Sequence, residues 1–313
     1  MVNILPHHMR SRVILIALVL GLATLPTSQG GYAIEVEGVG VVFGGLTLDA
    51  NNSGNATSSL ADLPAVVEYY TATWCSNCVD VEHALDDIEA DGVNIQQFHF
   101  HRDQDNEDPW GTPEGEERWD ERYDGGVAPT VVFNGSVKKI GSISEGDSLQ
   151  EDYTALAQKD LAIGVGSSSM TWQMTDNNSG NFSWNIIHDE NLIPEGGDLV
   201  NMLWISERFA NFPDGSNGVE DYPHVVKSLI NLGNQSMGTM NIVLPEAHDG
   251  EDLQLHLVHQ IILPEPCDEC IEVEDSPSLS PTDNESSGLP SIGLIAVLSV
   301  VMIAAFTVQR KLQ

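Results

Sequence analysis

The sequence Thr73-Trp74-Cys75-Ser76-Asn77-Cys78 lies between an apolar run and an amphipathic stretch. Residues 63–71 are rich in valine and tyrosine and predict a buried strand, whereas residues 78–89 place apolar side chains at helical spacing between acids. A Cys-x-x-Cys pair at a strand-to-helix turn puts the first sulfur at a helix N-terminus, where free backbone N–H groups stabilise a thiolate. The second sulfur lies one turn later and can attack a mixed disulfide formed by the first. The stretch therefore predicts redox chemistry.

Regular structure is predicted on the C-terminal side of this stretch as well. Residues 93–100, 130–133 and 137–140 read as strands, and residues 148–159 read as a closing helix. The acidic segment 101–124 contains aromatic side chains and predicts a helical insert that borders the cysteines. Together these elements form an α/β unit.

This arrangement resembles the thioredoxin fold, with Trp-Cys-x-x-Cys before the helix and Ala-Pro-Thr at residues 128–130 opening a later strand. It is closest to secreted thioredoxin-like proteins that carry a β-rich C-terminal region. The resemblance covers residues 63–159 and implies that Cys75 is the attacking thiol, Cys78 the resolving thiol and Pro129 a cis residue beside them. It makes the following residues active-site neighbours: Trp74, Ser76, Asn77, Ala128, Pro129 and Thr130.

One position departs from the thioredoxin pattern. Classical thioredoxins place a buried aspartate six residues before the first cysteine, and Tyr69 stands there in this chain. Glu68 precedes it and is expected to point to the opposite face of the strand. The sequence therefore leaves open which carboxylate, if any, accepts a proton from Cys78.

Residues 163–271 have a different pattern, with alternating apolar and polar residues between Gly, Asn, Asp and Pro punctuation. The predicted fold class is an α/β thioredoxin fold at 62–162 followed by an all-β sandwich-like domain at 163–271. Residues 33–61 are predicted to be a lead-in strand and linker.

Both ends of the chain resemble segments that direct a protein to a membrane or anchor it there. Residues 1–32 fit a signal peptide, with an uncleaved anchor as the alternative. Residues 272–289 read as an acidic Ser/Pro stalk, and residues 290–309 predict one C-terminal transmembrane helix whose basic end, residues 310–313, stays cytoplasmic. The helix resembles the sorting signals of archaeal and bacterial surface proteins, and a plain tail anchor explains the same residues. We therefore expect an extracytoplasmic body that is anchored by its C-terminus to the membrane or cell surface.

The charge distribution fits an exported body. The chain has 12 Lys and Arg against 47 Asp and Glu, for a net charge of −35. Four cations lie outside residues 35–285, so that segment holds 8 cations, all 47 acids and a net charge of −39. Such a surface disfavours nucleic acid as a partner, and we expect it to attract cationic or unfolded substrates at low salt. Seven Asn-x-Ser/Thr sequons are available in a glycosylating secretory system, at Asn51, Asn55, Asn134, Asn177, Asn181, Asn234 and Asn284.

Alternatives remain for the cysteines. Cys75 and Cys78 could form a structural disulfide, and Cys267 and Cys270 could form either an electron relay or an exposed structural disulfide. The four cysteines together could bind zinc. His99 and His101 flank Phe100 at a strand end and could approach a metal or the thiols. We expect no cofactor and no metal.

Two functions remain. The first is a membrane-anchored thiol-disulfide oxidoreductase that acts on exported proteins with thiols or disulfides, although the sequence does not identify the electron partner or the direction. No cation lies between the cysteines and acids follow closely, which disfavours an extreme oxidant. The second is a cell-surface binding or structural protein in which the thioredoxin-like domain is a scaffold and the Cys-x-x-Cys a structural disulfide.

Overall fold

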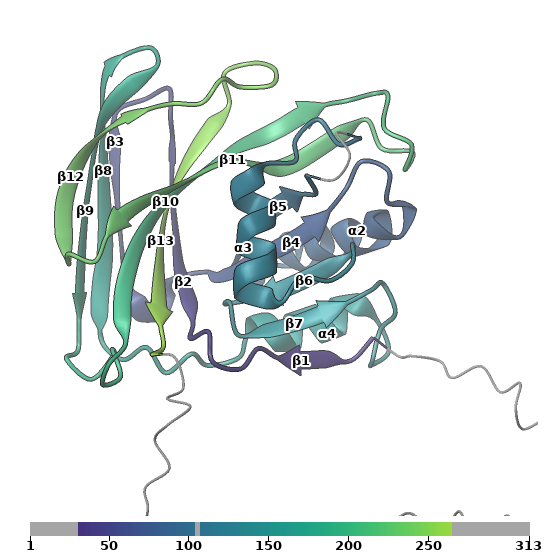
Figure 1. The fold of residues 1–313 in the computed structure, drawn as a ribbon, viewed down its shortest axis with the longest axis horizontal. Helices are drawn as coiled ribbons and strands as arrows, with labels where there is room; N and C mark the ends of the chain where they lie inside the picture. Colours follow the sequence, from purple (N-terminus) through teal and green to yellow (C-terminus); the bar gives the residue numbers. More distant parts are fainter. Residues whose placement is uncertain (1–30, 104–106, 265–313) are drawn as a thin grey trace, which may run out of the picture. The chain divides into compact units, whose positions relative to one another are not determined.

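The computed structural model describes residues 31–103 and 107–264, which form two β-sheets and a few helices (Figure 1). One sheet has nine strands in the order β1-β7-β6-β4-β5-β11-β10-β13-β2, and the other has four in the order β12-β9-β8-β3. The strands are β1 (Ala33–Glu35), β2 (Val42–Asp49), β3 (Gly54–Ser59), β4 (Ala65–Thr71), β5 (Ile95–His101), β6 (Thr130–Phe133), β7 (Val137–Ile140), β8 (Gly166–Asp176), β9 (Ser179–His188), β10 (Asp198–Asn211), β11 (Asp221–Gly233), β12 (Met237–Val243) and β13 (Leu253–Ile262). The helices are the 3₁₀ turn η1 (Leu60–Asp62), α2 (Ser76–Ala90), α3 (Pro113–Tyr123) and α4 (Leu149–Ala157).

Strand β4 is buried along its whole length because helices cover both faces of this part of the sheet (Figure 1). Val67 and Tyr69 pack in a cluster with residues of α2 and α4. Val66 and Tyr70 alternate with them and pack in a cluster with residues of α3 on the opposite face. The continuous apolar run in the sequence thus reflects a strand covered on both sides.

The nine-stranded sheet does not stop at the edge of this helical region. Strand β5 pairs in parallel with β11, with Val225 opposite His99. From there the sheet continues through β10 and β13 to β2. The described residues form one compact unit. Residues on both sides of the expected boundary at 162 therefore share one sheet.

The predicted fold class, an α/β thioredoxin fold followed by an all-β sandwich-like domain, is therefore wrong. The described residues contain thirteen strands and only three α-helices, so the chain is mainly β. The resemblance to thioredoxin-like proteins fails as a description of the fold for the same reason. Residues 33–61, predicted to be a lead-in strand and linker, supply three strands, of which β2 pairs with β13 and β3 with β8.

The part of the large sheet farthest from the helices packs against the four-stranded sheet. Their shared core includes Leu203, Leu257, Trp172, Phe182 and Trp184. A neighbouring polar contact is fully buried and satisfied: His259 lies between Ser168 and Asn201, at 2.8 and 2.7 Å. Burial lowers the pKa of His259 to about 3, with His188 adding to the effect, so this histidine is neutral near pH 7.

The predicted terminal segments lie outside the described residues, either wholly or, for the signal peptide, except for residues 31 and 32. They are the signal peptide at 1–32, the stalk at 272–289, the transmembrane helix at 290–309 and the basic end at 310–313. Between residues 31 and 264, the helices that the structure describes are too short or too polar to cross a bilayer.

Candidate functional site

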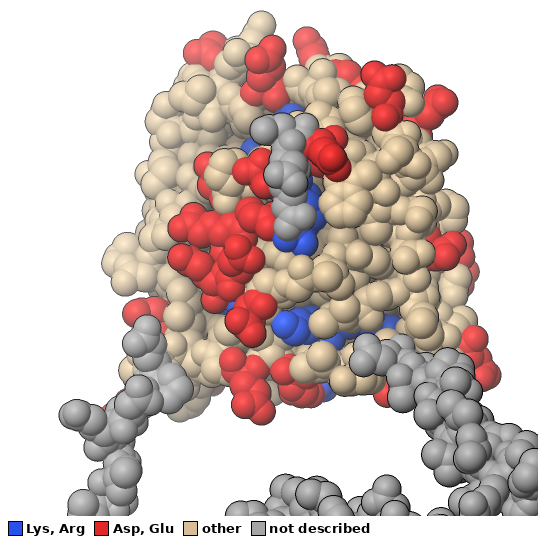
Figure 2. All heavy atoms as spheres, turned by 45° about the vertical axis from the view of Figure 1, so that its right-hand side comes forward, with Lys and Arg blue, Asp and Glu red and all other residues tan. Residues whose placement is uncertain are grey.

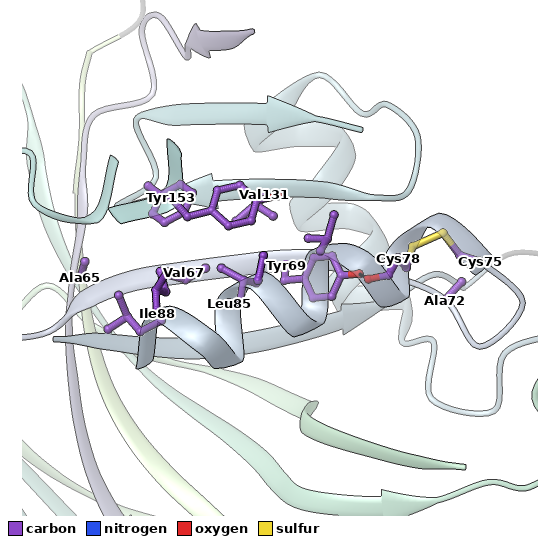
Figure 3. Packing of buried hydrophobic residues seen from close by; sticks show 14 residues of the cluster. Ala65, Val67, Tyr69, Ala72, Cys75, Cys78, Leu85, Ile88, Val131 and Tyr153 are labelled. Atoms are coloured by element: carbon purple, nitrogen blue, oxygen red, sulfur yellow. Dashed lines mark hydrogen bonds between the residues drawn. A yellow bond between two sulfur atoms is a disulfide. The ribbon is translucent and has the colours of Figure 1, made fainter. Parts of the chain in front are cut away.

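Cys75 and Cys78 form a disulfide at the start of helix α2 (Figure 3). Cys75 is the N-cap residue, and its own amide donates a hydrogen bond to the carbonyl oxygen of Ala72 at 3.0 Å. The amide of Cys78 donates to the carbonyl oxygen of Cys75 at 3.1 Å and so continues the turn into the helix. The first sulfur therefore lies at the positive end of the helix dipole, as the sequence predicts.

The two cysteines differ in their access to solvent. Cys75 is 7% exposed and Cys78 is 1% exposed, while Trp74 beside them is 38% exposed. Ser76 and Asn77 between the cysteines are exposed. Both cysteines are buried, and Cys75 is the more exposed of the two.

The Ala128–Pro129 peptide bond is cis, which confirms the conformation expected for Pro129. Ala128 packs against the apolar cluster that contains both cysteines. The hydroxyl of Thr130 donates to the carbonyl oxygen of Val127 at 2.7 Å. The structure thus brings the predicted proline segment to the same cluster as the disulfide.

A feature that the sequence did not reveal holds the turn before the disulfide. The amide of Thr73 donates to the Asp108 carboxylate at 2.7 Å, and the Thr73 carbonyl accepts from the amide of Asn217 at 3.1 Å. Asp108 also accepts from His101 Nδ1 at 2.8 Å. Burial alone would raise the pKa of Asp108, but the hydrogen bonds from His101, Thr73 and Trp110 outweigh it and hold that pKa below its ordinary value. We call this set of contacts the Thr73 clamp.

Two carboxylates, Glu68 and Glu82, lie on opposite sides of strand β4. Glu68 points to the α3 face, as predicted, and is bound there by Arg118. Tyr69, on the α2 face, donates its hydroxyl to the carbonyl oxygen of Cys78 at 2.6 Å (Figure 3). Glu82, which the sequence analysis did not single out, is buried on α2 four residues after Cys78. Residues at this spacing are neighbours on a helix surface.

Glu82 is a protonated acid near neutral pH. Burial raises its pKa to about 8, and the neighbouring Asp86 adds to this effect. The sequence carries a signal for Glu82, because it occupies one of the inward-facing positions of the helix, which are otherwise apolar. Burial also raises the pKa of Asp86 on the same helix, but Glu82 is the one of the two that lies one turn from Cys78.

One face of the protein is acidic, and a small cavity lies beside the cysteine motif. Figure 2 shows that acidic side chains outnumber cationic ones on the face turned forward. Exposed acids of α3 include Glu114, Glu117 and Asp120. Next to the motif, a cavity of about 340 Å³ is lined by Asn77 and by apolar side chains such as Ile143. A side chain of a bound peptide would fit a cavity of this size.

His99 and His101 lie on the α2 side of β5 and are buried, and among residues 31–103 and 107–264 no group of three His, Cys, Asp or Glu side chains could hold a metal ion. His101 instead binds Asp108, and the ring of His99 lies 4.9 Å from that of Tyr69. Cys267 and Cys270 lie outside the described residues, so the relay, the second disulfide and the four-cysteine zinc site stay predictions.

Comparisons with known proteins assign no family. No family model and no curated protein matches the chain. Among solved structures, protein AGR_C_4864 from Agrobacterium tumefaciens is 15% identical, with a TM-score of 0.40, covering 64% of this chain and 93% of its own. HBP35 of Porphyromonas gingivalis is 16% identical, with a TM-score of 0.43, covering 72% of this chain and 82% of its own. Neither is described as a thioredoxin, and with TM-scores below 0.5 neither supports an inference about function.

Proposed function

We propose that this protein is an extracytoplasmic thiol-disulfide oxidoreductase that acts on exported proteins. The observation that carries the proposal is the unequal placement of the two cysteines at a helix N-terminus, with Cys75 partly accessible and Cys78 enclosed. A helix N-terminus favours the thiolate form, which is the nucleophile in disulfide exchange. Export and C-terminal anchoring rest on the sequence of the terminal segments.

The reaction proceeds through a mixed disulfide. In the reducing direction, the Cys75 thiolate attacks a substrate disulfide, so that one substrate sulfur bonds to Cys75 and the other leaves as a thiolate. Cys78 then attacks the sulfur of Cys75, which releases the second substrate thiolate and restores the Cys75–Cys78 disulfide. Two electrons pass from the protein to the substrate, and the reverse sequence oxidises substrate thiols. The reduction potential relative to the compartment sets the direction.

Glu82 is placed to take the proton that Cys78 must lose before it attacks. Cys78 and Glu82 are both buried on the same face of α2, so water has little access to either. A carboxylate with a pKa of about 8 is a stronger base than an ordinary one. The resolving step is therefore expected to quicken as the pH rises through the pKa of Glu82.

A Glu82→Gln variant is expected to lose this pH dependence. In the wild type, ionisation of Glu82 above about pH 8 supplies the base. The amide has no such ionisation, so we expect turnover to fall by about tenfold or more at pH 8.5 and the inflection near pH 8 to disappear. Steady-state disulfide reduction from pH 6 to 9.5 measures both. Asp91→Asn, an exposed change at the end of the same helix, is the control, and a profile in Glu82→Gln identical to that of the control argues against this role.

Trapping tests the proposed function directly. A Cys78→Ser variant of the full chain retains the attacking thiol and lacks the resolving one, so we expect it to accumulate a covalent complex with a disulfide-containing substrate. Dithiothreitol should reduce the mixed disulfide and release the substrate. A Cys75→Ser variant should form none. Equal trapping by the two variants, or none by either, contradicts the proposed mechanism.

A second candidate is a cell-surface binding or structural protein in which the Cys75–Cys78 disulfide is structural. The presence of the disulfide and the burial of both cysteines support this candidate directly. Redox turnover, in contrast, is inferred from the position of the Cys-x-x-Cys motif at a helix N-terminus. Reduction distinguishes the two candidates. If the disulfide is structural, its reduction should lower the thermal stability of the protein, and it should not exchange with protein substrates.

A further inference from the structure

The sequons within the described residues differ in their exposure to solvent. Asn134 is only 3% exposed, and its side-chain oxygen accepts a hydrogen bond from the amide of Val66 at 2.8 Å, so it cannot carry a sugar in the folded protein. The other sequons within the described residues all lie on the four-stranded sheet or on the turns next to it. Four of these asparagines are exposed and Asn181 is half-buried. The described sequons, apart from the buried one, are thus gathered on one sheet.

Most of the outer face of this sheet lacks charged side chains. Side chains alternate along its strands, so that Phe182 and Trp184 face the core while Ser183 and Asn185 face outward. Registered neighbours on the other strands continue this face, for example Thr171 beside Ser183. Away from the end where Asp176 pairs with Ser179, the outward positions are Asn55, Thr57, Ser59, Ser167, Ser169, Thr171, Gln173, Asn181, Ser183, Asn185, Ile187, Met237, Thr239 and Asn241. None is charged, although soluble surfaces usually carry about 25–35% charged residues.

Two of the exposed sequons meet at one end of the sheet. The turn between β2 and β3 and the turn between β8 and β9 lie together there, since the amide of Met174 donates to the hydroxyl of Ser53 at 2.9 Å. Asn51 and Asn177, one from each turn, line the same hollow of about 580 Å³. Asn55 follows at the start of β3, on the outward face.

We propose that this face and the turns at its end form a site of N-linked glycosylation, with Asn55 and Asn177 as its principal acceptors. Their side-chain amides make no hydrogen bond to another described residue, whereas the amide of Asn51 donates to the carbonyl oxygen of Glu251 at 3.0 Å. The neighbouring hydroxyl and amide groups suit contact with sugar hydroxyls. Asp176 is the carboxylate in these strands, and it accepts hydrogen bonds from the amide of Asn178 and the hydroxyl of Ser179. The oligosaccharide covers a surface on which most strand positions are uncharged.

The modification transfers a glycosyl group from a lipid-phosphate-linked oligosaccharide. The side-chain nitrogen of asparagine bonds to the anomeric carbon of the sugar, and the bond from that carbon to the lipid phosphate oxygen breaks. The lipid phosphate leaves, and the nitrogen loses one proton. No electrons are exchanged, so the step is independent of the cysteines and of the proposed redox function. It requires that the chain is exported and meets a glycosyl-transferring enzyme with its lipid-linked donor.

Glycopeptide mapping of the full chain, purified from cells that naturally export it, tests the proposal. We expect oligosaccharide on the peptides that contain Asn55 and Asn177 and none on the peptide that contains Asn134. Asn55→Gln and Asn177→Gln should each lower the intact mass by one oligosaccharide. Ser136→Ala is the matched control, because it removes the sequon of Asn134 without changing that buried side chain, and it should lower the mass only by the difference between the two residues.

Each other outcome contradicts the proposal. A chain recovered from the extracytoplasmic fraction with the mass of the bare polypeptide overturns the glycosylation site while leaving the proposed redox function intact. Oligosaccharide on Asn134 overturns the structural sorting of the sequons. Retention of the chain in the cytoplasm overturns export, and both the glycosylation site and the extracytoplasmic role fall with it.

Discussion

A Cys75→Ser variant is expected to reduce insulin disulfides no faster than the dithiothreitol that drives the assay. Cys75 is the more exposed of the two cysteines and lies at the N-terminus of α2, so it is the sulfur that forms the bond to substrate. Cys78 is 1% exposed and cannot substitute for it. Because a serine hydroxyl does not exchange with disulfides, the expected loss is complete. Insulin precipitation with equal amounts of wild type and variant measures it.

The matched control is Ser76→Ala. Ser76 is exposed between the two cysteines, and its replacement leaves both sulfurs and the helix in place. We expect its turnover to stay within about twofold of the wild type, since surface substitutions are usually mild. Turnover by Cys75→Ser above the dithiothreitol background would show that the activity does not depend on this thiol, and the structural-disulfide candidate would then be favoured.

An Arg118→Met variant is expected to lose about 3–5 kcal/mol of the free energy of unfolding. Arg118 Nε and Nη2 bind the two oxygens of Glu68 at 2.6 and 2.8 Å, and both side chains are buried. Burial alone would raise the pKa of Glu68, but Arg118 and the Tyr123 hydroxyl outweigh it and hold that pKa below its ordinary value. Removing the guanidinium leaves a carboxylate in the core with only tyrosine hydroxyls as donors. Denaturant unfolding at pH 7 measures the loss.

Two further variants test whether the loss comes from the unpaired buried charge. A double variant, Glu68→Gln with Arg118→Met, leaves no buried charge, so it should recover part of the lost stability. Lys159→Met breaks an exposed ion pair with Glu35 and should cost about 1 kcal/mol or less. If Arg118→Met were as mild as Lys159→Met, the buried pair would not stabilise the fold in the way its geometry implies.

Local patterns in the sequence predicted many individual elements correctly. The apolar run before Thr73 forms β4, the helical spacing after Cys75 forms α2, and the acidic insert contains α3. The alternating runs after residue 163 form strands as expected. These elements are set by side chains a few residues apart, and such spacing is visible in a single sequence. The position of both cysteines at the start of a helix follows from the same patterns.

The arrangement of these elements could not be predicted in the same way. The pairing of Val225 with His99 joins strands more than a hundred residues apart, and no local period records it. The hydrogen bonds of Asp108 and Asn217 with Thr73 also join distant segments, and they leave no periodic pattern in the sequence. Strands β2 and β3 were missed because their sequence is rich in Gly, Asn and Ser, which resembles a linker. The error in fold class arose from these long-range contacts.

The Thr73 clamp can form only after a late part of the chain has folded. Asn217 lies in the connection between β10 and β11, 142 residues after Cys75. A chain that emerges from a membrane N-terminus first presents both cysteines long before the segment that binds the Thr73 carbonyl. A fragment ending at residue 162 would contain the whole Cys-x-x-Cys motif and the proline segment, yet the turn that precedes Cys75 would lack one of its two anchors. The local site is therefore complete only when almost the entire body has been delivered and folded.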